Sequence, residues 1–70
     1  MSMSMDINEK KQKILDILGK EKEIATTKIA FLITANLYQT EIYLEELFED
    51  KLILFEKRSN ATYWRLNGKK

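Results

Sequence analysis

Residues 29–66 decide the fold, and they read IAFLITANLYQTEIYLEELFEDKLILFEKRSNATYWRL. Two segments with helical spacing of apolar residues meet at the short polar turn 34–36, and two strand-like segments then follow around a basic tip. This order places one helix and one hairpin side by side, where both can contact the same partner. We therefore expect a mainly α domain with a C-terminal β-hairpin, in the α+β class.

The best-defined element is a helix over about 37–51. Asn36 and Gln39 have the spacing of a capping box, which marks its start. At about 100° per residue, one buried stripe collects Leu37, Thr40, Leu44, Leu47, Phe48 and Lys51. The opposite surface holds Tyr38, Gln39, Ile42, Glu45, Glu46 and Glu49, and Tyr43 lies at the edge between the two.

The hairpin is expected over about 52–67, because Leu52–Phe55 is a dense apolar run that reads as a strand. Its two-residue turn is either Ser59-Asn60 or Asn60-Ala61, since Asn tolerates positive φ. Either turn gives the same two faces. One face carries Ile53, Phe55, Trp64 and Leu66, with Trp64 in the core, and the other carries Glu56, Arg58, Tyr63 and Arg65.

Two further helices precede this region. The first, over about 6–19, starts at an Asp6–Glu9 capping box, stops at Gly19 and has one apolar face, made of Ile7, Ile14, Leu15 and Leu18 with Ile17 beside it. Ile24 forms either a very short strand or a lone apolar anchor. The second helix, over about 26–34, is capped by Thr26 and turns Ile29, Ala30, Leu32 and Ile33 inward.

Length and composition limit the possible functions. Seventy residues make one domain, which we place at 6–67, between a disordered tail at 1–5 and a basic tail at 68–70. The chain has no Cys and no His, which removes disulfides, thiol chemistry and the usual zinc ligands. We expect that the protein is not an enzyme, and that it has no catalytic residue, metal or cofactor. No apolar run is long enough to span a membrane and no secretory signal is present, so a cytoplasmic location with no membrane partner is expected.

The net charge of +1 conceals a strong segregation. Residues 36–51 carry five acids against Lys51, a net charge of −4, whereas residues 52–70 carry five cations against Glu56, a net charge of +4. The central helix is therefore acidic and the C-terminal part is basic.

The chain resembles the winged helix-turn-helix family over residues 7–67. Ile29-Ala30 stands where a Leu-Ala pair usually opens the second helix, and Leu52-Ile53 stands where a Gly-Leu-Ile/Val sequence leads into the wing, with Lys51 replacing the Gly. The buried positions of the recognition helix match Thr40, Leu44 and Leu47, and the returning strand matches residues 63–66.

The resemblance implies a sequence-specific DNA-binding protein, a transcriptional regulator that binds double-stranded DNA. Because one copy of seventy residues with a modest basic patch would bind one half-site weakly, we expect a homodimer formed by the first helix or the tails. The third helix would enter the major groove and the basic wing would contact the backbone or minor groove. Gln39 would pair with an adenine edge and Ile42 would touch a thymine methyl. The DNA-binding residues implied in this way are Thr27, Lys28, Tyr38, Gln39, Ile42, Tyr43, Lys57, Arg58 and Asn60.

The acids of the third helix leave a second interpretation open. Glu45, Glu46 and Glu49 would be repelled by phosphate, so DNA contact would have to be confined to the first turn and a half of the helix. The alternative is a protein-interaction or assembly module that docks a basic partner on this acidic face. The candidate residues also have plain structural interpretations: Ile42 as a scattered surface residue, Tyr38 and Tyr43 as cover for the helix junction, and the wing cations as a solubilising tip.

Overall fold

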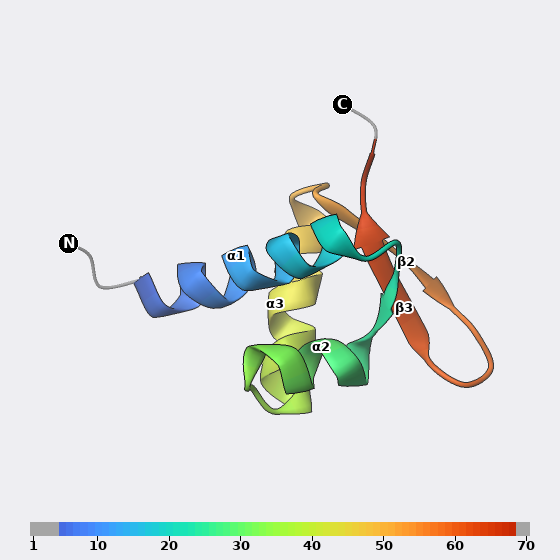
Figure 1. Cartoon of the computed structure of the whole chain (residues 1–70), viewed down its shortest axis with the longest axis horizontal. Helices are drawn as coiled ribbons and strands as arrows, with labels where there is room; N and C mark the ends of the chain where they lie inside the picture. The colour runs from blue at the N-terminus through green and yellow to red at the C-terminus, as the bar shows by residue number, and fades with distance from the viewer. Residues whose placement is uncertain (1–4, 69–70) are drawn as a thin grey trace.

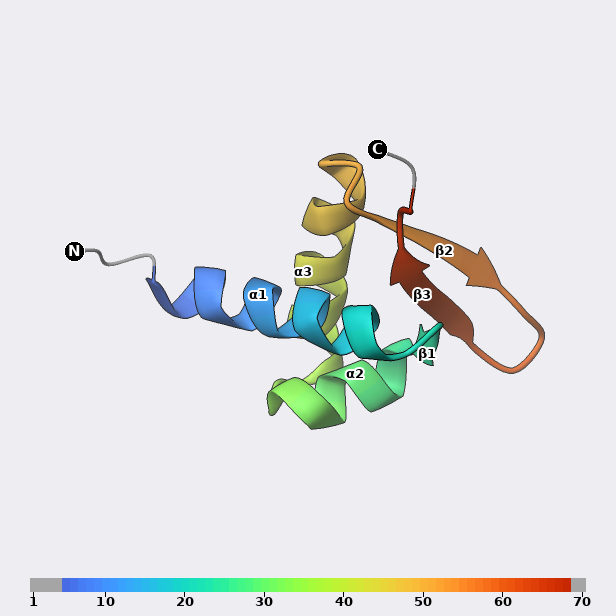
Figure 2. The same ribbon diagram turned by 45° about the horizontal axis from the view of Figure 1, so that its top comes forward.

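The computed structural model describes residues 5–68 of the chain, with side chains from residue 9 onward. The elements in order are α1 (Met5–Lys20), β1 (Ile24–Ala25), α2 (Thr26–Ile33), α3 (Leu37–Glu49), β2 (Ile53–Lys57) and β3 (Thr62–Leu66). The three helices cross one another on one side of the molecule, and the small sheet lies on the other with the β2–β3 loop extending outward (Figures 1 and 2). The expected α+β class and order of elements are confirmed.

Helix α1 begins at Met5 and ends at Lys20, one residue beyond the predicted bounds at each end, so Gly19 lies inside the helix. Ile14 and Leu18 are buried and Leu15 and Ile17 pack against the core, which confirms the apolar face from Ile14 onward. The side chains of Asp6 and Ile7 lie outside the described residues, as do residues 1–4 of the predicted N-terminal tail and residues 69–70.

Helix α2 departs from the predicted capping. Its N-cap is Ala25, which makes no side-chain hydrogen bond, and Thr26 is instead a buried residue of the helix. The expectation that Thr26 caps the helix was wrong, because its hydroxyl bonds to the sheet. Leu32 was expected to point inward but is 37 % exposed, since Ile29, Ala30 and Ile33 already fill the inner face.

The turn between α2 and α3 contains no glycine. Thr34 takes the left-handed conformation, with φ 57°, and the Ala35 N–H donates to the Ala30 carbonyl over 3.0 Å. From α1, the Lys10 ammonium donates to the Ile33 carbonyl over 2.7 Å, so a side chain of another helix closes the end of α2.

Helix α3 confirms the predicted start and corrects the predicted end. The Asn36 side chain accepts a hydrogen bond from the Gln39 N–H over 2.7 Å, as a capping residue does. The helix ends at Glu49, so Lys51 is not on its buried stripe; with φ 66° it makes the bend into β2 at the position where the family has glycine. Leu37 and Phe48 were expected to be buried but are 45 % and 41 % exposed. They lie on the flank of the stripe, where the neighbouring elements cover only part of each side chain.

The three strands form an antiparallel sheet in the order β1-β3-β2. The register pairs Phe55 with Trp64 and Lys57 with Thr62, and the Arg58 N–H donates to the Ala61 carbonyl, so Ser59-Asn60 is the two-residue turn. Within residues 5–68 only Thr34 and Lys51 have positive φ, so Asn60 does not use the conformation expected of it. Ile24 belongs to a true strand, because it pairs with Trp64 across β1 and β3.

The core lies where the three helices meet the inner face of the sheet. Its buried members are Ile14, Leu18, Ile24, Ile29, Ile33, Leu44, Leu47, Ile53 and Trp64. The Trp64 Nε1–H donates to the Thr26 hydroxyl over 2.7 Å, and that hydroxyl donates to the Thr62 carbonyl over 3.2 Å. This pair of hydrogen bonds joins the start of α2 to β3 and so positions the wing relative to the helices.

Candidate nucleic-acid interface

The first turn of α3 presents the polar residues that the sequence singled out. Tyr38 is 72 % exposed and Gln39 is exposed beside it. The Tyr43 hydroxyl donates to Gln39 Oε1 over 2.9 Å, which leaves the two Nε2 protons of the amide free to donate outward. Ile42 is half-buried, and Tyr43 packs against the core. Tyr43 therefore orients Gln39 and supports the helix rather than projecting from it.

The first turn of α2 is the second predicted contact. Thr27 and Lys28 are both exposed there. The N-cap residue is Ala25, whose side chain accepts no hydrogen bond from the first backbone N–H groups of α2. A helix end of this kind favours an anion such as phosphate.

The wing tip is more constrained than the sequence indicated. Arg58 donates to both oxygens of Glu23 over 2.8 and 2.9 Å, donates to Glu56 over 3.2 Å, and lies 4.4 Å from the centroid of the Tyr63 ring. Asn60 donates to the Tyr63 hydroxyl over 3.2 Å. The hydrogen bond from the Arg58 guanidinium, reinforced by its charge, lowers the pKa of the Glu56 carboxyl. Lys57 is exposed and forms no ion pair with any side chain in residues 9–68.

The three predicted segments lie along the same side of the molecule. In both views α3 begins at the lower end, the β2–β3 loop reaches toward the lower right, and the start of α2 lies between them (Figures 1 and 2). The elements are thus arranged so that one extended partner can contact the amide end of α3, the start of α2 and the wing together.

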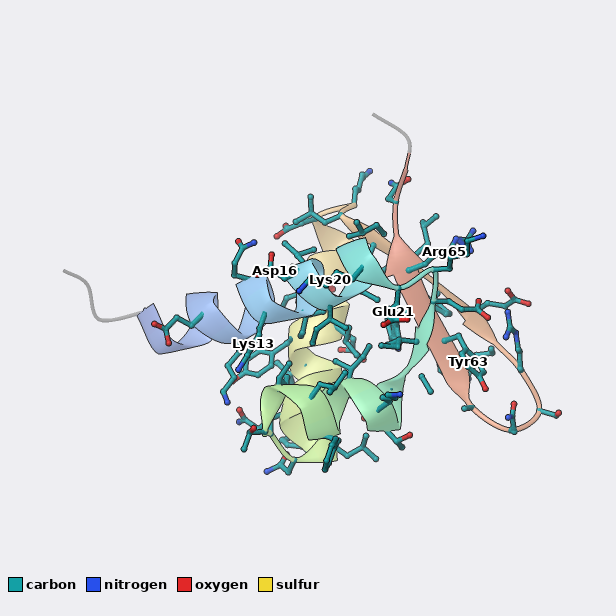
Figure 3. The ribbon with its side chains drawn as sticks, in the orientation of Figure 1. Lys13, Asp16, Lys20, Glu21, Tyr63 and Arg65 are labelled. Carbon is teal, nitrogen blue, oxygen red and sulfur yellow. The ribbon has the colours of Figure 1, made fainter. Side chains whose placement is uncertain are left out.

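The cations of α1 lie elsewhere. Lys11 pairs with Glu46 of α3 over 2.7 Å, and Lys10 bonds to the carbonyls that end α2. Figure 3 shows Lys13 and Lys20 extending from α1, and Tyr63 and Arg65 projecting from one side of β3, as the strand alternation predicted. Lys10 and Lys11 therefore have structural contacts within the molecule, and neither lies in the predicted interface.

The sequence did not reveal that α3 turns acids toward the wing. Two adjacent hollows lie between α3 and the sheet, and Phe48 lines both. The first, of about 300 Å³, is lined by Thr26, Glu41, Glu45, Phe48, Phe55, Lys57, Thr62 and Trp64. The second, of about 410 Å³, is lined by Phe48, Glu49, Lys51, Ile53, Leu54 and Asn67. We call the two together the α3–β2 groove. Its α3 side carries Glu41, Glu45 and Glu49, so a phosphate backbone is disfavoured within the groove itself.

Two of these features were missed in the sequence, and only the second had a usable signal there. Glu23 lies in a connector of alternating charges, and nothing there marks it as the partner of Arg58, 35 positions away. Glu41 could have been found from the helical stripe, because it lies one turn before Glu45 on the side of α3 that also carries Phe48.

Within residues 5–68, no group of three or more Cys, His, Asp or Glu side chains is arranged to hold a metal ion. Over the same residues, every helix is too short or too polar to cross a bilayer.

Comparison with known proteins identifies the fold. No protein-family model matches this chain, and neither does any curated protein. Among solved structures, the Zalpha domain of Carassius auratus PKZ, crystallised in complex with Z-DNA, superposes with a TM-score of 0.80 at 18 % identity over 87 % of this chain and 97 % of that one.

A fragment (residues 1–100) of a possible transcriptional regulatory protein of Mycobacterium bovis superposes with a TM-score of 0.75 at 24 % identity, over 96 % of this chain and 81 % of that one. The order helix, short strand, two helices and hairpin, together with both superpositions, shows that the chain has the winged-helix fold.

Proposed function

We propose that this protein binds double-stranded DNA through the first turn of α3, the start of α2 and the tip of the wing, and acts as a transcriptional regulator. The observation that carries the proposal is the placement of these three segments along one side of the molecule (Figures 1 and 2). The two structural neighbours support it, since one was crystallised with Z-DNA and the other is described as a possible transcriptional regulatory protein.

The contacts divide into those that read bases and those that hold the backbone. Gln39, with its carbonyl fixed by Tyr43, offers its amide to a purine edge; Tyr38 is exposed beside it, and the half-buried Ile42 follows one helical turn after Tyr38. Lys28 and Lys57 supply charge to phosphates, with Thr27 and Asn60 as uncharged partners.

Arg58 can contact phosphate only after it gives up an ion pair within the molecule. Its guanidinium is already paired with Glu23 and Glu56, so a phosphate must replace a carboxylate before Arg58 adds to binding. The acids of α3 set a second limit. Glu41, Glu45 and Glu49 lie beyond the first turn, so the helix meets DNA with its N-terminal end while its acidic half tilts away.

The test is a titration of fluorescently labelled duplexes by anisotropy at increasing salt. Two or three cations in contact with phosphate give a slope of about −2 to −3 in log K against log salt for one protomer. Lys28→Ala and Lys57→Ala should weaken binding to all sequences alike, whereas Gln39→Ala should change the preferred sequence. Parallel titrations with right-handed duplex and with an alternating CG duplex held in the Z form establish which shape is preferred. No binding to either duplex at low salt would refute the proposal.

We also propose that the chain binds DNA as a homodimer, because two copies double the small number of contacts that one copy can make. Light scattering of the free protein and of its complex with DNA measures this directly. A complex that holds one protomer per duplex at saturating protein would show this part of the proposal to be wrong.

A further inference from the structure

The α3–β2 groove has an apolar floor that remains open to solvent. The rings of Phe48 and Phe55 meet edge to face with centroids 5.1 Å apart, and Phe55 lies 5.2 Å from Trp64. Trp64 is buried, but Phe48 and Phe55 are 41 % and 44 % exposed. Half-exposed aromatic rings in a concave surface are typical of a binding site.

One wall of the groove is negatively charged. Glu41, Glu45 and Glu49 follow one another at intervals of four residues, so they form a row along one side of α3. None of them forms an ion pair with any side chain in residues 9–68. The opposing wall carries Lys57 at one hollow and Lys51 at the other, so the charge is divided between the two walls. A cationic side chain entering along α3 would meet three unpaired carboxylates.

The outer edge of β2 is unpaired. The backbone N–H of Arg58 donates to the Ala61 carbonyl on the β3 side. In an antiparallel pair every second residue bonds to the same neighbour, so the backbone groups of Glu56 and Leu54 also bond to β3. Phe55 and Lys57 therefore direct their backbone N–H and C=O groups to the other side. In the described part of the chain no strand lies there, because the sheet order is β1-β3-β2. An open edge of this kind accepts an extended peptide as an added strand.

We propose that the α3–β2 groove binds an extended peptide segment of a partner protein, in which the side chains on one face, at every second residue, include both lysine or arginine and apolar residues. The peptide backbone pairs with the edge of β2 at Phe55 and Lys57, its cations lie beside Glu41 and Glu45, and its apolar side chains cover Phe48 and Phe55. This inference does not rest on the DNA-binding proposal, since Lys28 and Gln39 line neither hollow; the two sites share only Lys57, which lines the first hollow.

Trp64 is the only tryptophan of the chain and lines the groove, so its fluorescence reports on occupancy. The probe is a nine-residue peptide with threonine at the even positions and with lysine and valine in turn at the odd positions, so that one face carries both. Its control has glutamate in place of each lysine. A third peptide, N-methylated at every peptide bond, lacks the donors for strand pairing. We expect the lysine peptide to change Trp64 emission in a saturable manner, and both other peptides to fail.

The matched variants separate a specific site from general attraction between charges. The double variant Glu41→Gln with Glu45→Gln removes two exposed carboxylates that would pair with lysines of the peptide. Its affinity for the lysine peptide should therefore be roughly 2- to 30-fold weaker. Asp16→Asn with Glu21→Gln removes the same charge from residues that do not line the groove (Figure 3), and should leave the affinity unchanged. The first double variant should also tighten DNA binding, so the same change acts in opposite directions on the two ligands.

Three results would overturn the inference. The first is equal binding of the lysine and glutamate peptides, and the second is equal loss of affinity in the two double variants. The third is peptide binding that weakens as the protein concentration rises, which would assign the groove to a second copy of the chain. Circular dichroism of each variant confirms that it is folded, and because all four substitutions are at exposed positions, failure to bind cannot be ascribed to unfolding.

Discussion

The hydrogen bonds of Thr26 make a sharp test of how the wing is held. Thr26→Val keeps the shape of the side chain but removes the hydroxyl that accepts from Trp64 and donates to Thr62. Thr26 and Trp64 are 8 % and 7 % exposed, so water cannot fully replace the lost partner. An unsatisfied buried polar group costs about 1–3 kcal/mol. In a domain of this size, 1 kcal/mol corresponds to about 4–8 °C, so the melting temperature should fall by about 4–24 °C.

Urea unfolding followed by circular dichroism measures the change in free energy. Thr26→Ser, which keeps the oxygen and loses one methyl group, is the matched control and should cost less than Thr26→Val. Trp64→Phe removes the donor, so the same Thr26→Val change should cost about 1 kcal/mol less in that background than in the wild type. If Thr26→Val costs the same in both backgrounds, the hydrogen bond contributes nothing and the reasoning is refuted.

Four other predictions concern individual side chains. Ile14→Ala, at a fully buried position, should cost about 2–5 kcal/mol in urea unfolding, and a cost below 1 kcal/mol would contradict the assigned core. Lys51→Gly should stabilise the protein by about 0.5–1 kcal/mol, because glycine adopts positive φ without strain; a loss of stability would contradict this. Glu23→Gln should release Arg58 and tighten binding to all duplexes in the anisotropy titration, and unchanged affinity would show that Arg58 does not reach phosphate. The pKa of Glu56 is lowered below its ordinary value of 4.5, so the melting temperature of Glu56→Gln should lie below that of the wild type at pH 7. The difference should vanish at the acidic pH that protonates Glu56. A difference that persists at that pH would rule out the ion pair as its cause.

Sequence patterns predicted the elements better than their ends. Periodicity located α3 and its buried residues Thr40, Leu44 and Leu47, and strand alternation placed Trp64 in the core whichever turn was chosen. The ends were less accurate because they depend on backbone conformations that side chains only weakly indicate. Lys51 was counted as helical, although it takes the left-handed conformation that glycine would more readily adopt.

The candidate site was less predictable, because it depends on contacts between distant residues. Exposure of Tyr38 and Gln39 follows from the helical stripe, which is local information. The pairing of Arg58 with Glu23 and of Trp64 with Thr26 spans 35 and 38 positions and appears only when the chain is folded. The charge of a residue could therefore be predicted, but not whether a neighbour already neutralises it.

The contact of Lys10 has a consequence for covalent modification. Its ammonium closes the end of α2 by donating to the carbonyls of Ile33 and Thr34, over 2.7 and 3.4 Å. Acetylation of this amine would abolish its charge and leave a single N–H donor on a bulkier group, weakening the tie between α1 and the turn that precedes α3. Acetylation of Lys13 or Lys20, which extend from α1 into solvent (Figure 3), would alter only surface charge. Acetylation of Lys10 would therefore change how α1 is held against the turn between α2 and α3.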